Sequence, residues 1–161
     1  MTLKDKASKI KLAAFDIDGV MTDGSLTFDE NGVEYKTFNA KDGQGVVRLN
    51  NAGIITAIIT ARDNGTVTHR AKILNIKELH QGQKNKIATL EKIMEKYNIS
   101  FDEVAYMGDD LPDICVLEKV GIAACPNDAV DEVKNVANFI SAKNGGRGAV
   151  RELCDFIVNN Q

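Results

Sequence analysis

The sequence predicts an α/β fold in which helices cover both faces of a parallel sheet. Apolar runs of strand length, several of them ending on acidic or polar residues, alternate along the chain with longer segments whose apolar residues recur at helical spacing. Strands and helices that alternate in this way form parallel sheets with right-handed crossovers. With 161 residues, 43% of them hydrophobic and 27% charged, the chain fits one globular domain over residues 1–161.

Charge and cysteine content narrow the class of protein. The net charge of −3 argues against a nucleic-acid partner or an anionic membrane. Cys115, Cys125 and Cys154 are odd in number and include no Cys-x-x-Cys pair, which favours reduced thiols over a disulfide framework or a zinc site. The first residues are charged, and no hydrophobic stretch long enough for a signal peptide or a membrane span follows them. We therefore expect a cytoplasmic protein.

The first strand is predicted over the apolar residues 10–15, and it ends on Asp16 and Asp18. Ligands of open α/β sheets bind at the carboxyl ends of the strands. Two acids that lie two residues apart point the same way on extended backbone, and Gly19 then lets the chain turn close to a ligand. Together they suit a hard cation and a phosphate, although Asp-Ile-Asp-Gly alone also fits an ordinary turn.

A β-hairpin is predicted next, over residues 25–38, because apolar and polar residues alternate on both sides of Asn31-Gly32. An isolated two-stranded hairpin is only marginally stable, so we expect it to pack against another surface, and an equivalent hairpin of a second subunit is a natural candidate. Residues 39–43 then lead into a helix over residues 44–51.

The remaining chain continues the alternation. Further strands are expected over residues 54–59, 75–79, 104–108, 121–125 and 139–140, and helices over residues 64–74, 84–97 and 149–159, with one helix whose first turn holds Pro112 and a short one opened by Asp128. A glycine-rich turn at residues 144–148 starts the C-terminal tail, residues 144–161. Thr60 and Asp109-Asp110 end two of these strands, and Lys86 lies near the start of a helix, so these residues are expected to join Asp16 and Asp18.

These residues match the needs of phosphate ester hydrolysis, a very slow reaction without catalysis. Asp16 could attack phosphorus, and Asp18 could protonate the leaving oxygen and later activate water. Asp109 would complete a Mg²⁺ site, while Thr60 and Lys86 would hold the phosphoryl group.

Each residue also has an ordinary structural interpretation. A threonine at a strand end often caps a helix, and a lysine that opens a helix is usually solvated, so neither Thr60 nor Lys86 is informative alone. Asp110 and Asp113 could be a helix cap and a first-turn acid. The combination and order of these residues favour a joint site.

Four segments resemble the signature motifs of the haloacid dehalogenase superfamily of phosphohydrolases: residues 16–24, Ile59-Thr60, Lys86 and residues 108–113. More narrowly, nearly the whole chain is similar to the capless 3-deoxy-D-manno-octulosonate 8-phosphate (KDO 8-phosphate) phosphatases. The specific marks are residues 18–24, 38–43, 60–62, 81–86 and 145–152. The resemblance implies a Rossmann-like three-layer sandwich without a cap domain, whose protruding hairpin serves oligomerisation.

The resemblance also implies a reaction and an assembly. A phosphoric monoester hydrolase of this family forms an aspartyl-phosphate, here on Asp16, with Mg²⁺ held by Asp16, the Asp18 carbonyl and Asp109. It releases KDO and phosphate for lipopolysaccharide precursor synthesis. It is a homotetramer in which hairpins build a central barrel and a neighbouring subunit covers each active site. Residues matched to contacts with the sugar acid phosphate are Asn39, Ala40, Lys41, Asp42, Gly43, Arg62 and Arg70, besides Asp18 and Lys86, and the tail with Arg147 could reach a neighbouring site.

Two departures from the family pattern and three alternatives remain. Ala61 replaces the glycine that is usual in the family, which puts the geometry of this turn in doubt, and Met21 replaces a commoner leucine.

By analogy with the family, Arg62 favours the eight-carbon KDO 8-phosphate over the nine-carbon KDN or sialic acid 9-phosphates. A phosphatase of those nine-carbon acids and a non-catalytic oligomerisation module are alternatives. A phospho-accepting receiver domain is a third, but its lysine follows the last active-site strand, whereas Lys86 precedes Asp109.

Overall fold

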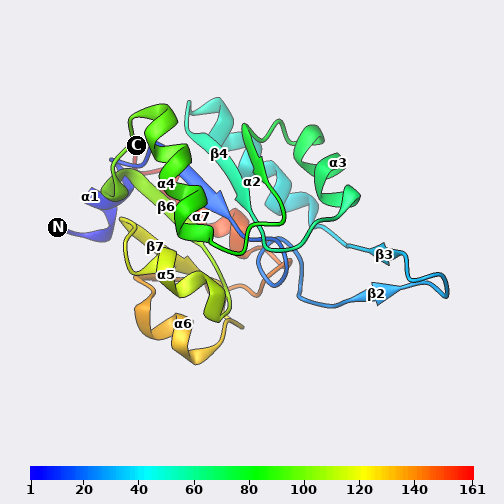
Figure 1. The fold of residues 1–161 in the computed structure, drawn as a ribbon. Coiled ribbons are helices and arrows are strands. Elements are labelled where there is room, and N and C mark those ends of the chain that lie inside the picture. Colours follow the sequence, from blue (N-terminus) through cyan, green and yellow to red (C-terminus); the bar gives the residue numbers. More distant parts are fainter.

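The computed structural model describes residues 1–161, and a six-stranded sheet forms its centre (Figure 1). The strand order is β5-β4-β1-β6-β7-β8, and every neighbouring pair is parallel. The strands are β1 (Leu12–Phe15), β4 (Ile55–Ile59), β5 (Glu78–His80), β6 (Val104–Met107), β7 (Ile122–Cys125) and β8 (Phe139–Ile140). The predicted α/β fold is confirmed.

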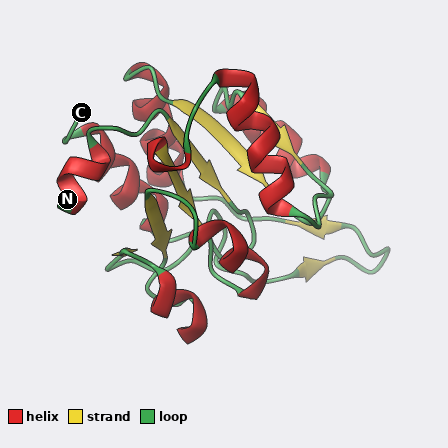
Figure 2. Cartoon of the chain, turned by 60° about the vertical axis from the view of Figure 1, so that its left-hand side comes forward, coloured by secondary structure: helices red, strands yellow, loops and turns green.

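Helices cover both faces of this sheet, so the molecule has three layers (Figure 2). One face packs against α1 (Leu3–Ala7), α2 (Ala40–Asn51), α3 (Gly65–Ile73) and α7 (Ala149–Val158). The other packs against α4 (Lys86–Tyr97), α5 (Ile114–Leu117) and α6 (Asp131–Val136). Two short 3₁₀ helices, η1 (Phe101–Glu103) and η2 (Leu111–Asp113), lie on either side of β6 in the chain. None of the helices is long and apolar enough to cross a bilayer.

The strand order determines where the acidic residues meet. The chain runs from β1 to β4 and β5 on one side of the sheet, then crosses to β6 on the other side. Phe15 of β1 lies in register with Ile58 of β4 and with Met107 of β6, so these three strands end at the same edge. The crevice between β1 and β6 is the topological switch point, where open α/β sheets bind ligands.

The start of α2 differs from the prediction. The helix begins at Ala40 rather than at residue 44, because the Asn39 side chain caps it by accepting hydrogen bonds from two backbone N–H groups. Gly43 therefore lies inside the helix. A Cβ on Gly43 would come within 2.4 Å of an Arg70 nitrogen, so glycine here permits close packing between α2 and α3.

The predicted strand over residues 75–79 is shorter and shifted. Asn75 adopts a left-handed conformation with φ 53°, and the Ile76 N–H donates to the Ala71 carbonyl, which ends α3. The strand β5 therefore begins only at Glu78.

The hairpin is confirmed as an element, and it projects from the rest of the molecule (Figure 1). Its strands are β2 (Thr27–Phe28) and β3 (Glu34–Tyr35). The loop spans residues 29–33 rather than two residues: the Asp29 carboxylate accepts hydrogen bonds from two loop N–H groups, and only Gly32 has positive φ. Four large apolar side chains on this segment are more than half exposed: Leu26, Phe28, Val33 and Tyr35.

Candidate active site

An open cavity of about 490 Å³ lies at the switch point. Residues of the predicted motifs surround it, together with Leu26 at the start of the predicted hairpin. Its lining consists of Asp16, Asp18, Gly19, Gly24, Leu26, Thr60, Ala61, Arg62, Lys86, Asp109, Asp110, Pro112 and Asp113.

Asp16 follows β1 directly and is nearly buried. One carboxylate oxygen accepts a hydrogen bond of 2.7 Å from the Ile17 N–H, and the other lies 3.0 Å from Lys86 Nζ. Burial raises the pKa of Asp16 to about 6, and the nearby charge of Asp113 adds to this effect, although Lys86 opposes it. The Asp16 carboxylate is thus held in one orientation at the cavity, and with this raised pKa it is still mostly ionised at pH 7.

Lys86 begins α4 and has a buried side chain. Its Nζ bridges Asp16, at 3.0 Å, and Asp113, at 2.7 Å. Burial works against its charge, but the two carboxylates outweigh burial and raise the pKa of Lys86 above its ordinary value. Lys86 is therefore a permanent cation inside the cavity and not a solvated helix-opening residue.

Asp113 accepts four hydrogen bonds and is 1% exposed. Its Oδ1 accepts from Lys86 Nζ and from the Tyr106 hydroxyl at 2.6 Å, and its Oδ2 accepts from the backbone N–H groups of Asp109 and Asp110. The Asp110 side chain in turn caps η2. Asp113 therefore combines the two roles considered for it, since it completes this cap and also orients Lys86 and the loop that carries Asp109.

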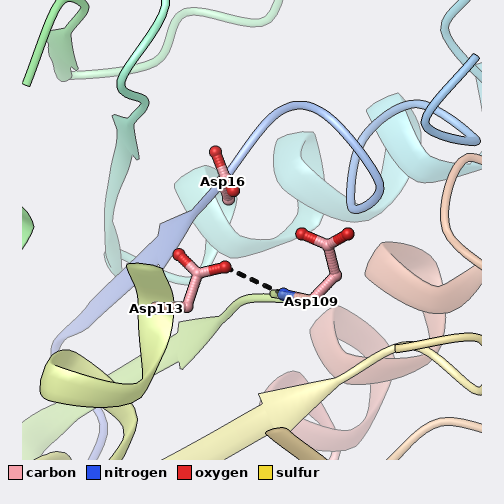
Figure 3. A group of neighbouring side chains, drawn as sticks. All are labelled: Asp16, Asp109 and Asp113. Atoms are coloured by element: carbon pink, nitrogen blue, oxygen red, sulfur yellow. Dashed lines mark hydrogen bonds between the residues drawn. The ribbon is translucent and has the colours of Figure 1, made fainter. Parts of the chain in front are cut away.

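Asp109 follows β6 and faces Asp16 and Asp113 across one small space (Figure 3). One carboxylate oxygen from each of the three residues lies within 4.8 Å of the other two. Burial raises the pKa of Asp109 to about 8, with further contributions from the charges of Asp16, Asp113 and Asp110. A Cβ on Gly19 would come within 1.9 Å of Asp109 Oδ2, so Gly19 makes room for this carboxylate.

The donor set fits a hard divalent cation. Asp113 has all its strong acceptor positions taken, whereas Asp109 accepts no hydrogen bond through its side chain and the Asp18 carbonyl oxygen accepts none either. Asp16 and Asp109 thus offer free oxygen lone pairs where negative charge is concentrated. Oxygen ligands of this kind favour Mg²⁺ over softer metals.

Asp18 belongs to a separate group of charges. Lys36 Nζ lies 2.6 Å from its Oδ1, and Arg62 Nη1 lies 3.3 Å from its Oδ2. Glu34 joins the two cations, because one of its oxygens lies 2.9 Å from Lys36 Nζ and the other pairs with Arg62 Nη2. The four side chains form a closed ring, and two of them, Asp18 and Arg62, line the cavity.

Thr60 follows β4, has a buried side chain and lines the cavity. Its backbone N–H and carbonyl bond to His80 and Gln83, while its hydroxyl makes no hydrogen bond within the chain and is free for a ligand. Ala61 has no positive φ, so the expected geometric problem at this departure from the family pattern is absent.

The other predicted substrate residues lie outside this cavity. Residues 39–43 form the N-terminal end of α2, where the buried Asp42 carboxylate accepts a hydrogen bond from the Arg151 N–H of α7. The guanidinium of Arg70 donates to the Asn39 carbonyl. Lys41 and Arg147 line a second cavity of about 370 Å³.

The glycine-rich start of the tail packs on the acidic loop of its own chain. The Gly146 N–H donates to the Val20 carbonyl, and Arg147 lies 3.6 Å from Asp23. Asp128, predicted to open a helix, instead accepts a hydrogen bond from the Gly145 N–H, and α6 begins only at residue 131.

Sequence reasoning missed three residues: Glu34, Lys36 and Tyr106. Glu34 and Lys36 lie two apart at the end of the predicted hairpin, where extended backbone would point both side chains the same way, and the sequence shows this spacing. Tyr106 places a hydroxyl in a fully buried apolar strand, and a buried tyrosine hydroxyl needs a partner.

Comparisons with known proteins agree with this geometry. Residues 74–153 match the model of the haloacid dehalogenase-like hydrolases. The chain is 42% identical over 153 residues to the KDO 8-phosphate phosphatase KdsC of Escherichia coli K12, which covers 95% of the chain and 81% of that protein.

Two solved structures are also similar. One is the KDO 8-phosphate phosphatase of Moraxella catarrhalis in complex with magnesium, phosphate and KDO, with TM-score 0.97, 39% identity and coverage of 99% and 91% of the two chains. The other is the cobalt-bound phosphatase YrbI of Haemophilus influenzae, with TM-score 0.93, 34% identity and coverage of 97% and 91%. The chain therefore belongs to the KDO 8-phosphate phosphatase family of the haloacid dehalogenase-like hydrolases.

Proposed function

We propose that this protein is a Mg²⁺-dependent phosphomonoesterase that hydrolyses KDO 8-phosphate to KDO and phosphate, and so supplies KDO for lipopolysaccharide precursors. The observation that carries the proposal is the buried Asp16–Lys86–Asp113 arrangement, which shares one cavity with Asp109 and Asp18. A 42% identical relative bears the name of this activity, and a similar structure holds magnesium, phosphate and KDO.

In the first step, a carboxylate oxygen of Asp16 attacks phosphorus and the bond from phosphorus to the sugar oxygen breaks. The leaving alkoxide takes a proton from Asp18. Lys86 neutralises charge on the phosphoryl oxygens, and the free Thr60 hydroxyl donates a hydrogen bond to one of them. The product of this step is an aspartyl-phosphate on Asp16 and the free sugar acid.

In the second step, Asp18 takes a proton from a water molecule whose oxygen attacks the same phosphorus. The bond between phosphorus and Asp16 breaks, which regenerates the carboxylate and releases inorganic phosphate. The same residue therefore acts first as an acid and then as a base, as both steps require.

Mg²⁺, held by Asp16, Asp109 and the Asp18 carbonyl, would offset the negative charge of the phosphoryl group and of the carboxylates. Asp113 would keep Lys86 and the Asp109 loop in place while leaving the cation to the other two carboxylates.

Recognition of the sugar acid falls to basic residues from two subunits. Arg62 lines the cavity with 42% of its side chain exposed, and its planar guanidinium suits a carboxylate. Arg70 and residues 39–43 lie outside the cavity of their own chain, as does Arg147. Asp42 and Gly43 are buried within their own chain, whereas Asn39, Ala40, Lys41, Arg70 and Arg147 would contact the substrate of a neighbouring subunit.

The assembly proposed is a cytoplasmic homotetramer built through the hairpins. The apolar side chains of Leu26, Phe28, Val33 and Tyr35 project into solvent on an element too small to be stable alone. Packing hairpins of several subunits together would cover these side chains and place neighbours over each cavity.

Phosphate release tests the proposal. The purified protein and its Asp16→Asn variant are assayed with KDO 8-phosphate, a nine-carbon 2-keto-3-deoxy acid phosphate and a simple aryl phosphate, each with and without Mg²⁺. We expect fast, Mg²⁺-dependent release that favours KDO 8-phosphate and is lost in the variant, which keeps the shape of the side chain but lacks the nucleophilic oxygen.

Other outcomes change the assignment in defined ways. Preference for the nine-carbon ester would transfer the assignment to a nine-carbon acid phosphatase. Activity on the aryl ester alone would support the proposed phosphatase mechanism but contradict KDO 8-phosphate as the substrate. A folded protein with no release from any ester would favour an oligomerisation module.

A further inference from the structure

Lys36 reaches the active site from the hairpin rather than from the sheet. It follows β3, and its side chain is only 2% exposed. Burial of an ammonium group is costly unless carboxylates pair with it. Lys36 Nζ meets this requirement with Asp18 at 2.6 Å and Glu34 at 2.9 Å.

The ring of Lys36, Glu34, Arg62 and Asp18 restrains the Asp18 carboxylate at both of its oxygens. Lys36 holds Oδ1 and Arg62 holds Oδ2. Glu34 also accepts hydrogen bonds from both cations, so neither cation can leave Asp18 without disturbing its contact with Glu34. Rotation of the Asp18 carboxylate would break at least one charge-assisted hydrogen bond.

We infer that Lys36 is a positioning residue that fixes the orientation in which Asp18 exchanges protons with the leaving alcohol and with water. The inference rests on the proposed function and extends it. Because Lys36 comes from the hairpin, the geometry of Asp18 depends on how the hairpin lies on the cavity. A proton-transferring group that is misplaced by about 1 Å loses much of its effect, on the order of 100-fold.

A leaving-group comparison separates this role from a purely structural one. An alkyl phosphate needs a proton on its leaving oxygen, whereas the phenolate of p-nitrophenyl phosphate leaves without one. Misplacing Asp18 therefore slows both steps for an alkyl ester, but only the second step for the aryl ester. If Lys36 only held the hairpin in place, its loss would slow hydrolysis of both esters to the same extent.

The experiment compares the full-length wild type with Lys36→Met, Lys36→Arg and a control, Lys92→Met, at an exposed position on α4. Steady-state hydrolysis of an alkyl phosphate and stopped-flow release of p-nitrophenolate are measured with saturating Mg²⁺. For Lys36→Met we expect kcat on the alkyl ester to fall about 10- to 100-fold, with KM changed less than about threefold.

With p-nitrophenyl phosphate, the same variant is expected to show a burst of about one phenolate per site followed by slow turnover, because the phosphoenzyme accumulates. Lys36→Arg keeps a cation within reach of Asp18 and is expected to restore the alkyl rate to within about fivefold of wild type. Lys92→Met is expected to behave as wild type.

A Lys36→Met variant that is as active as wild type, or that loses burst rate and alkyl kcat equally, would overturn the inference. Where sedimentation shows that Lys36→Met does not assemble as wild type does, Glu34→Gln is the deciding variant, because it weakens the ring and keeps Lys36. For Glu34→Gln we expect kcat on the alkyl ester to fall about 3- to 10-fold, with the same burst on the aryl ester. A Glu34→Gln variant without this selective loss would also overturn the inference. A wild type that hydrolyses no ester would overturn the proposed function together with this inference.

Discussion

Binding of Mg²⁺ should depend on pH, because the cation must displace protons from the carboxylates of Asp16 and Asp109. Without a cation, the pKa of Asp109 is raised to about 8 and that of Asp16 to about 6, burial being the largest cause in both cases. Both groups must be ionised to bind Mg²⁺. Lowering the pH from 8 to 6 is therefore expected to weaken Mg²⁺ binding.

The two pKa values give the size of the effect. At pH 7 about nine tenths of Asp109 and about one tenth of Asp16 carry a proton, so binding should release about one proton per ion. Integrated from pH 6 to pH 8, the release corresponds to an affinity increase of roughly 100-fold. The release should fall to about 0.1 proton at pH 9, where both groups are already ionised.

Stability should follow the same linkage. The folded-state pKa of Asp109 lies above its ordinary value of 3.8, so folding favours the protonated form. This contribution to the free energy of unfolding is fully present below about pH 4 and is lost as the pH rises through about 8. The increase in Tm caused by Mg²⁺ relative to a chelator should accordingly be larger at pH 8 than at pH 6.

Isothermal titration calorimetry in two buffers of different ionisation enthalpy measures both the affinity and the number of protons released. Asp109→Asn should abolish measurable binding, whereas Glu118→Gln, which changes an exposed acid, should leave it unchanged. Equal affinity at pH 6 and pH 8, or release of fewer than about 0.3 proton at pH 7, would refute the reasoning, because the carboxylates would then not be protonated before binding.

Three substitutions test other contacts. Tyr106→Phe removes the 2.6 Å hydrogen bond to Asp113 and should lower the free energy of unfolding by about 2 kcal/mol, seen as a Tm about 4–8 °C lower by calorimetry. Gly19→Ala places a Cβ 1.9 Å from an oxygen of Asp109 and should weaken Mg²⁺ binding more than about tenfold in the same titration. Phe28→Asp puts a charge on the exposed apolar face of the hairpin and should dissociate the proposed homotetramer in sedimentation experiments.

Each substitution has a matched control. Tyr97→Phe also removes a hydroxyl bonded to a carboxylate, but far from the site, so it should leave Mg²⁺ binding unchanged, whereas Tyr106→Phe should weaken it. Gly32→Ala shares the positive-φ penalty of Gly19→Ala without the clash, and Ile73→Asp changes an equally exposed apolar side chain on α3. An unchanged Tm, unchanged Mg²⁺ affinity or an intact oligomer in the three test variants would contradict the respective arguments.

The meeting point of Asp16, Thr60 and Asp109 could be predicted from the sequence because it depends on the sheet topology alone. Asp16, Thr60 and Asp109 each follow an apolar run, and parallel strands in one sheet end at a common edge. No knowledge of side-chain packing is needed for this step. The same reasoning explains why the cavity contains all of these residues.

Other features depend on tertiary contacts that local patterns do not encode. Gly43 disfavours a helix by its own propensity, yet it lies inside α2, where Asn39 caps the helix and Arg70 packs too close to allow a Cβ. In the sequence, Asp113 fits an ordinary first-turn acid. In the structure, its carboxylate accepts hydrogen bonds from Lys86 on α4 and from Tyr106 on β6. Lys36 reaches Asp18 only through the path of the hairpin.

The distribution of charge explains why four of the five aspartates that line the cavity can serve different roles. Asp16, Asp109 and Asp113 share a single cation, Lys86, so three carboxylates and one ammonium leave two negative charges when all are ionised. A divalent ion balances this excess, which fits a metal site with a nucleophile beside it. The fourth, Asp18, instead pairs with two cations of its own, Lys36 and Arg62. Cations contact both oxygens of the Asp18 carboxylate, so the backbone carbonyl of Asp18, and not its side chain, is left free for a metal ion.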